Sequence, residues 1–130
     1  MAEYHSISDL VKLSIDNNQE IWQVVLTGQA QDKMMSERDV FAQMKQMYRA
    51  MKSADELYDW QLKSPSGMAG GDGYRMRQYN ESGNNICGDF IGMVMEKALK
   101  MGESNACMKR IVAAPTAGSC GVLPSVLIDW

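Results

Sequence analysis

Residues 36–61 read SERDVFAQMKQMYRAMKSADELYDWQ, and this stretch decides the fold class. Ser36 followed three residues later by Asp39 is a helix-capping pattern. Apolar side chains then recur every three or four residues from Val40 to Leu57, which is the period of one face of an α-helix. We therefore expect a long amphipathic helix that begins at Ser36 and runs to about Gln61.

Shorter helices are predicted on both sides of this one. The first begins at Ile7 behind a capping pattern at Ser6–Asp9 and ends near Asn17 and Asn18. The others span Ile21–Gly28 and Cys87–Leu99 with Gly102 as its cap, and a last helix opens at Pro124. No alternating strand pattern and no internal repeat is present. The sequence thus predicts an all-α helical domain fragment with two glycine-rich loops.

The first loop is the stretch 64–73, SPSGMAGGDG. Four glycines and a proline in ten residues exclude a helix or a central strand. The stretch carries one charge, Asp72, so it is either a flexible linker or a loop that contacts a ligand or a neighbouring domain. We expect a less regular segment after it, from Tyr74 to Asn85.

The second loop lies in Ile111–Pro124, IVAAPTAGSCGVLP. Glycines and small side chains between two apolar elements let backbone N–H groups approach another molecule closely. The helix that Pro124 opens has about seven residues before Trp130, and so short a helix is not stable alone. We therefore expect the chain to end inside an element and to be the front part of a larger protein.

The composition excludes several classes of function. The 130 residues hold 13 basic and 16 acidic side chains, a net charge of −3, which does not favour binding to nucleic acid. No apolar run is long enough for a membrane span, and the polar N-terminus is not a signal peptide. A cytoplasmic protein with neither nucleic acid nor membrane as partner is the expectation.

Cysteine and methionine content points to structural roles. Cys87, Cys107 and Cys120 are irregularly spaced, which favours free thiols over a metal knuckle or a disulfide framework. The twelve methionines are expected mainly as flexible core filler, with an adaptable partner surface as the alternative.

No catalytic group is identified from the residues alone. His5 stands by itself near the N-terminus, and Ser119 lacks the glycine two positions earlier that a nucleophile elbow requires, since Ala117 occupies that place. Without another histidine to act as base, hydrolase chemistry is not predicted. What remains is a helical domain whose two loops suit a small polar ligand or an anion.

A family resemblance adds a reaction. Ala114-Pro-Thr-Ala-Gly-Ser-Cys-Gly-Val-Leu-Pro124 resembles the APTxGxxGxxP segment of iron–sulfur-dependent L-serine dehydratases, also called L-serine ammonia-lyases. Ser66-Gly-Met-Ala-Gly-Gly-Asp72 resembles the glycine-rich GLTGGD loop of the two-chain branch of that family. The similarity covers essentially the whole chain in order and corresponds to the N-terminal part of the catalytic α chain, truncated inside a helix.

The resemblance implies deamination of L-serine to pyruvate and ammonia, a step of amino-acid catabolism that can feed gluconeogenesis. In the family a [4Fe–4S] cluster acts as the Lewis acid that polarises the leaving hydroxyl. The residues implied in substrate binding are those of the two loops: Ser66, Gly67, Gly70, Gly71, Asp72, Thr116, Ala117, Gly118 and Ser119.

The family's cluster-binding cysteines lie downstream of the segment matched here, so we expect no metal ligand and no cluster on this chain alone, and an inactive isolated fragment. The implied partners are L-serine, the missing C-terminal half of the α chain, a β chain and further copies in a homo-oligomer. The alternative is a non-catalytic helical module that binds a partner or oligomerises through its methionine-rich faces. The general base and the preference between serine and threonine are not predicted.

Overall fold

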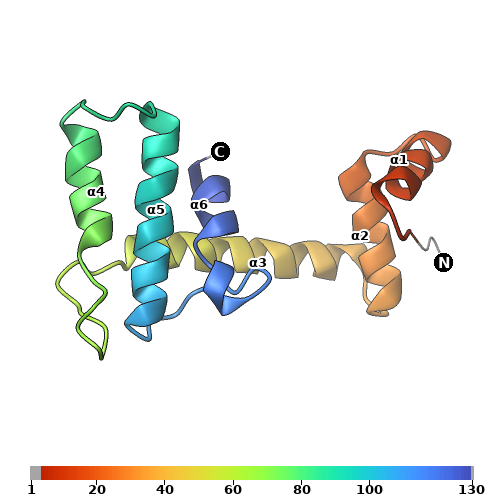
Figure 1. Cartoon of the computed structure of the whole chain (residues 1–130). Helices are drawn as coiled ribbons and strands as arrows, with labels where there is room; N and C mark the ends of the chain where they lie inside the picture. Colours follow the sequence, from red (N-terminus) through yellow and green to blue (C-terminus); the bar gives the residue numbers. More distant parts are fainter. Residues whose placement is uncertain (1–3, 130) are drawn as a thin grey trace. The chain divides into compact units, whose positions relative to one another are not determined.

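The computed structural model describes residues 4–129, and over this range every regular element is helical, which confirms the all-α prediction. The elements are α1 (Ile7–Asp16), α2 (Ile21–Asp32), α3 (Glu37–Glu56), α4 (Asp72–Glu81), α5 (Asp89–Ala106), the short 3-10 helix η1 (Ala117–Ser119) and α6 (Val122–Asp129) (Figure 1). The chain divides into two compact units, Met1–Gln46 and Met47–Trp130.

The first unit packs α1 against α2. The predicted cap of α1 is confirmed, because the Ser6 hydroxyl accepts a hydrogen bond from the Asp9 backbone N–H at 3.2 Å. Helix α2 does not end at Gly28 as expected but continues to Asp32. Gly28 is buried inside the helix, and a Cβ there would lie at ordinary contact distance, 3.4 Å, from the Tyr4 ring, so neither strain nor crowding at this position ends the helix.

Helix α3 begins where the capping pattern predicts, with the Asp39 N–H bonded to the Ser36 hydroxyl at 3.2 Å. It ends at Glu56, however, and not near Gln61. The Asp59 carboxylate accepts from the Gln61 N–H at 2.9 Å, a local side-chain bond that favours a turn over another helical turn. Because α3 ends here, Tyr58 lies outside the helix, and its hydroxyl reaches Glu103 of the candidate site.

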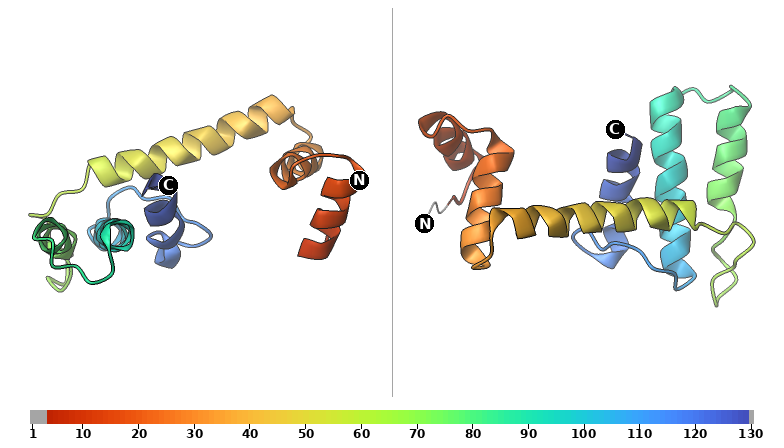
Figure 2. Two further views of the ribbon diagram at one scale, coloured as in Figure 1. Left: turned by 90° about the horizontal axis from the view of Figure 1, so that it is seen from above. Right: turned by 180° about the vertical axis from the view of Figure 1, so that it is seen from behind.

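In the second unit α4, α5 and α6 run side by side in alternating directions, with α5 in the middle (Figures 1 and 2). Residues 47–56 of α3 run across α5 and α6 (Figures 1 and 2). The buried core is small and consists of Ala54, Met101 and Cys120, with Ile111 and Ile128 packed against it.

Charged side chains attach the end of α3 to α5. The Asp55 carboxylate lies 2.9 Å from Lys97 Nζ and 3.4 Å from Lys100 Nζ, and Lys100 also pairs with Glu96 at 3.0 Å. The four side chains are only 12–16% exposed. Removing one partner from such a group leaves a poorly solvated charge, so the cluster fixes this crossing although it adds little net stability as a whole.

Helix α4 corrects the expectation of an irregular segment from Tyr74 to Asn85. The segment has no apolar stripe from which a helix could be predicted. It is helical because of side-chain contacts, such as the Arg77–Glu81 pair at 2.9 Å, and because its first turn is capped by a residue of α5.

Helix α5 also differs from its predicted bounds. It extends through Gly102, the expected cap, to Ala106. The added turn buries Glu103 and Ser104. Both residues line a small pocket together with Tyr58.

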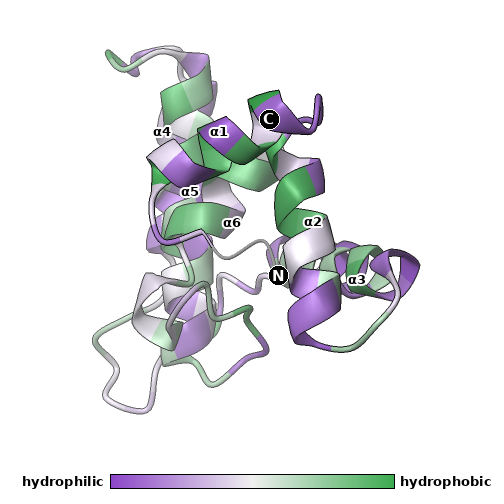
Figure 3. Ribbon diagram, turned by 90° about the vertical axis from the view of Figure 1, so that its right-hand side faces the viewer, coloured by the Kyte–Doolittle hydropathy of each residue, from purple (hydrophilic) through white to green (hydrophobic). Residues whose placement is uncertain are grey.

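The methionines are mostly exposed, contrary to the prediction that they fill the core. In the described part of the chain only Met51 and Met101 are buried, whereas Met44, Met47, Met93 and Met95 are more than 40% exposed. Figure 3 shows hydrophobic residues over much of α6, where four large apolar side chains are exposed: Val122, Leu123, Val126 and Leu127. Over the described residues, no helix combines the length and the apolar character that crossing a membrane requires.

Glycine at 121 allows the entry to α6 to touch α5. A Cβ on Gly121 would lie 2.8 Å from the Ala98 carbonyl oxygen, a backbone atom that cannot move alone. Gly102 offers a matched comparison, because it lies inside α5 and a Cβ there would meet nothing within 4 Å.

We expect Gly121→Ala to lower the free energy of unfolding by about 1–3 kcal/mol through overpacking. Gly102→Ala should instead raise it by about 0.5–1 kcal/mol, since alanine loses less backbone entropy in a helix. Urea unfolding followed by circular dichroism measures both. Equal effects of the two substitutions would contradict the close approach at Gly121.

Candidate functional site

The two glycine-rich loops flank the C-terminal end of α5. Residues 64–71 lead into α4, and residues 114–121 lead through η1 into α6 (Figure 1). Glu103 bonds to the residues that follow the first loop, and Asn105 bonds to the second loop. Two residues separated by two positions in a helix, as these are, point about 200° apart around its axis. The loops therefore lie on different sides of α5, and among the described residues no hydrogen bond joins them.

Buried Ser64 organises the first loop. Its N–H donates to the Ala69 carbonyl at 2.9 Å, its carbonyl accepts from the Gly67 N–H at 2.8 Å, and its hydroxyl accepts from the Ala69 N–H at 3.1 Å. The Ser66 hydroxyl lies 3.1 Å from that of Ser64. These bonds favour an ordered loop over a flexible linker.

Gly70 and Gly71 have structural roles in this loop. Both are buried, with φ of 136° and 90°, and a Cβ on Gly70 would lie 2.2 Å from the Leu62 carbonyl oxygen. The Lys63 ammonium donates to the Gly70 carbonyl at 2.5 Å. The other predicted residues of this loop are accessible: Ser66 and Gly67 are exposed, and the Asp72 carboxylate pairs with Arg75 at 2.5 Å on the surface.

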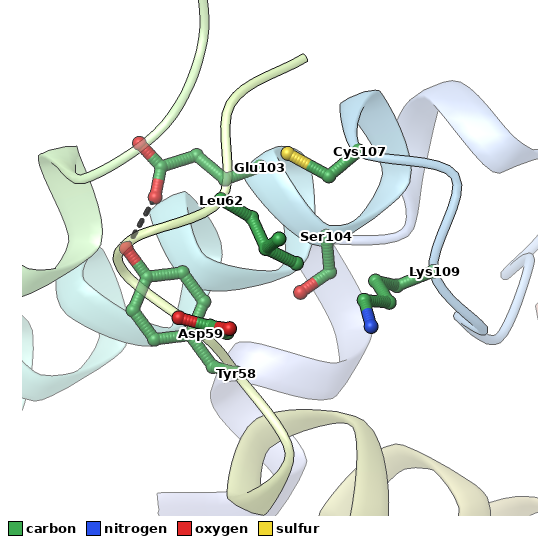
Figure 4. A pocket seen from close by; sticks show the side chains of 7 residues that line it. All are labelled: Tyr58, Asp59, Leu62, Glu103, Ser104, Cys107 and Lys109. Carbon is green, nitrogen blue, oxygen red and sulfur yellow. Dashed lines mark hydrogen bonds between the residues drawn. The ribbon is translucent and has the colours of Figure 1, made fainter.

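Glu103 is the residue that sequence reasoning missed. Its carboxylate is buried at the N-terminus of α4, where Oε1 accepts from the Asp72 N–H at 2.6 Å and Oε2 from the Gly73 N–H at 3.2 Å. Oε2 also accepts from the Tyr58 hydroxyl at 2.5 Å across a small pocket (Figure 4). The backbone donors expected to bind an anion at Asp72 are thus occupied by the protein's own carboxylate.

The buried Glu103 carboxylate affects the pKa of Tyr58. Burial raises the pKa of the Tyr58 phenol, and the hydrogen bond to Glu103 and its negative charge raise it further. Tyr58 therefore remains protonated at neutral pH and donates its proton to the carboxylate.

Ser119 ties the second loop together. Its hydroxyl accepts from the Thr116 N–H at 3.3 Å, lies 3.1 Å from the Thr116 hydroxyl, and is within reach of the Ala114 carbonyl at 3.2 Å. The Asn105 amide holds the loop to α5 through the Ala117 carbonyl at 3.3 Å. Thr116, Ala117 and Gly118 are exposed, so this loop presents backbone and hydroxyl groups to solvent.

Each loop borders a hollow on the surface. The second loop contributes Gly118 to an open, mainly apolar groove of about 530 Å³ between α5 and α6. The first loop contributes Gly71 to a pocket of about 470 Å³ that also holds Lys63 and Arg75 and is walled by the stacked rings of Trp60 and Tyr74, 5.0 Å apart. Two cations beside a glycine backbone can bind a small carboxylate.

The cysteines do not fit an iron–sulfur cluster. Cys87 is exposed, Cys107 is half-buried, and Cys120 is buried in the core with Sγ 3.7 Å from the Met101 carbonyl. Burial raises the pKa of the Cys120 thiol, which disfavours the thiolate that a metal requires. Over the residues described, no three His, Cys, Asp or Glu side chains are grouped so that they could hold a metal ion.

Comparisons with known proteins identify a family for this chain. The family described as serine dehydratase alpha chain matches residues 16–130. The "Probable L-serine dehydratase, alpha chain" of Bacillus subtilis (strain 168) is 29% identical over 95% of this chain and 41% of its own length. The L-serine dehydratase alpha chain of Peptoniphilus asaccharolyticus is 48% identical over 44% of this chain and 20% of its own.

A third relative is the L-serine dehydratase of Haemophilus influenzae, 28% identical over 95% of this chain and 28% of its own length. The chain thus spans less than half the length of these curated relatives. No solved structure matches it significantly.

The raised pKa of Tyr58 predicts how stability changes in alkali. The folded state keeps the phenol proton above pH about 10, where an unfolded tyrosine loses it, so the free energy of unfolding should fall as pH rises from there. Tyr58→Phe removes this contribution, and Tyr79→Phe, whose hydroxyl bonds the Asn84 carbonyl on the surface, is the control. Urea unfolding across this pH range should give a shallower decline for Tyr58→Phe alone; identical slopes would exclude the Tyr58–Glu103 coupling.

Proposed function

The chain belongs to the serine dehydratase alpha chain family, and we propose that it forms the N-terminal part of the catalytic chain of an L-serine dehydratase that releases pyruvate and ammonia. The observation that carries this proposal is that the family match includes both glycine-rich loops and the two helices between them, α4 and α5. Because the chain spans 41% of the Bacillus subtilis relative, the activity is assigned to the complete protein.

This chain's contribution to the reaction is to bind and orient serine. We assign the substrate carboxylate to the pocket beside the first loop, where Lys63 and Arg75 supply positive charge. The exposed polar groups of Ser66 and of Thr116–Ser119 are assigned to the substrate's ammonium and hydroxyl or to the walls of the closed site. Holding the substrate in one orientation is what positions its α proton and β hydroxyl for elimination.

The cofactor is assigned to the rest of the enzyme. A [4Fe–4S] cluster with an open iron would polarise the leaving hydroxyl as a Lewis acid. Since the environments of Cys87, Cys107 and Cys120 do not fit such a cluster, we propose that residues outside this chain hold it. The isolated chain is then inactive.

The experiment uses a chimera in which this chain replaces the corresponding part of the Bacillus subtilis alpha chain. Purified without oxygen, it should form pyruvate from L-serine. Lys63→Met should raise KM for serine about tenfold or more, because a charge-assisted hydrogen bond to the carboxylate is lost. Lys12→Met, an exposed lysine of α1, is the control and should leave KM unchanged.

A folded chimera that makes no pyruvate while the unaltered Bacillus subtilis enzyme does would refute the assignment. Pyruvate formation with unchanged KM in Lys63→Met would keep the reaction but refute the carboxylate pocket.

A second function, association through helical faces, is favoured by the exposed apolar residues of α6. Leu123 and Leu127 are 46% and 43% exposed on the helix that borders the groove with α5. Apolar surface of this kind is characteristic of a face that another chain or segment covers. We propose that α6 and its groove are covered by the rest of the α chain, by a β chain or by a second copy.

Association can be measured on the chain itself by sedimentation velocity at micromolar concentration. We expect a dimer or larger species that Val122→Glu with Val126→Glu, at two exposed residues of α6 that line the groove, converts to a monomer. Met108→Glu, at a methionine that is 84% exposed outside the groove, should not change the assembly. A monomer before substitution would argue against self-association and leave α6 to another chain.

A further inference from the structure

One buried carboxylate joins three parts of the second unit: α5, the start of α4 and the segment after α3. Glu103 of α5 is 7% exposed and accepts from the Asp72 N–H, the Gly73 N–H and the Tyr58 hydroxyl at 2.6, 3.2 and 2.5 Å. Tyr58 lies 45 residues away at the end of α3, and Asp72 opens α4 directly after the first loop. No other side chain of the described residues bonds these two backbone donors.

The local sequence cannot supply this cap. The N-cap residue of α4 is Gly71, which has no side chain to accept from the first N–H groups of the helix. A buried carboxylate is costly without hydrogen bonds, and a helix N-terminus carries a partial positive charge. Glu103 and the start of α4 therefore satisfy each other, and neither is satisfied without the contact.

The contact also fixes the backbone at the loop. Asp72 and Gly73 follow Gly70 and Gly71 directly, so their two bonds hold the end of the first loop against α5. Gly73 makes the approach possible, since a Cβ there would lie 2.8 Å from Lys100 Cγ and 3.2 Å from the Tyr58 hydroxyl. Gly71 is also one of the residues that line the pocket with Lys63 and Arg75, the cationic pocket.

We propose that Glu103 is a positioning residue: its carboxylate holds the first glycine-rich loop in place and closes the N-terminus of α4 to anionic ligands. An anion that enters the neighbouring pocket then meets Lys63 and Arg75 instead of the helix N-terminus. The identification of that anion as the serine carboxylate rests on the proposed function. The closure of the α4 N-terminus by Glu103 does not.

Amide NMR on the ¹⁵N-labelled chain tests the closure without an activity assay. Glu103→Gln should move the amide proton signals of Asp72 and Gly73 upfield and speed their hydrogen exchange, because an amide oxygen is a weaker acceptor than a carboxylate. Glu96→Gln is the matched control: it removes another largely buried carboxylate of α5, whose partners are Lys100 and Asn80.

Sulfate titration adds a second measurement, because a saturable shift on binding sulfate would not arise if the variant had simply lost its structure. In the unaltered chain sulfate can enter the pocket beside Gly71 but should leave the Gly73 amide signal unchanged, whereas in Glu103→Ala that signal should shift in a saturable way as the anion takes the vacated position. Should Glu103→Ala fail to fold, Glu103→Gln is titrated instead and should respond more than Glu96→Gln. A saturable sulfate shift of the Gly73 amide in the unaltered chain, or unchanged Asp72 and Gly73 signals in Glu103→Gln, would overturn the proposal.

The same substitution in the chimera separates positioning from the reaction. Glu103→Gln should raise KM for serine more than it lowers kcat, since the loop orients the substrate and does not react. Altered amide signals together with unchanged kinetics would confirm the closure but show that the first loop does not bind serine, which refutes the proposed function at that loop and not the positioning role.

Discussion

The carboxylate of Glu103 at the N-terminus of α4 is the contact on which the second unit depends. It lies on α5, receives a hydroxyl from the end of α3 and caps the helix that follows the first loop. The apolar core is too small to fix these elements alone, since it consists of Ala54, Met101 and Cys120 with two partly buried neighbours. Directional polar contacts around α5 therefore determine how the loops are presented.

The two loops are built on different principles. The first loop needs glycine at 70 and 71 because their φ values and the Leu62 carbonyl leave no room for a side chain, and it is anchored from outside by Glu103. The second loop is closed by its own Ser119 hydroxyl and attached to α5 by Asn105. The first is thus a rigid wall beside a cationic pocket, and the second presents Thr116, Ala117 and Gly118 to solvent.

Residue patterns located the helices with a regular apolar face and the two loops. They were wrong where tertiary contacts decide the outcome. Helix α4 has no apolar stripe and is capped from another helix. Helices α5 and α2 pass through Gly102 and Gly28 because no steric or conformational demand at either glycine ends the helix. The methionines were expected inside, but among the described residues only Met51 and Met101 are buried; Met44, Met47, Met93 and Met95 are exposed on helices, and Met34, Met68 and Met108 are exposed outside them.

The sequence by itself determined the helical class, the capped starts of α1 and α3, and the family, because helix periods, capping residues and motif order are local properties of the chain. Only the tertiary structure decided which polar groups are available for binding. Whether the Asp72 N–H can bind an anion depends on the carboxylate of Glu103, 31 residues further along the chain. No local sequence pattern predicts that these two residues come into contact. The cationic pocket has the same origin, since Lys63 and Arg75 come together only when the loop between them folds back.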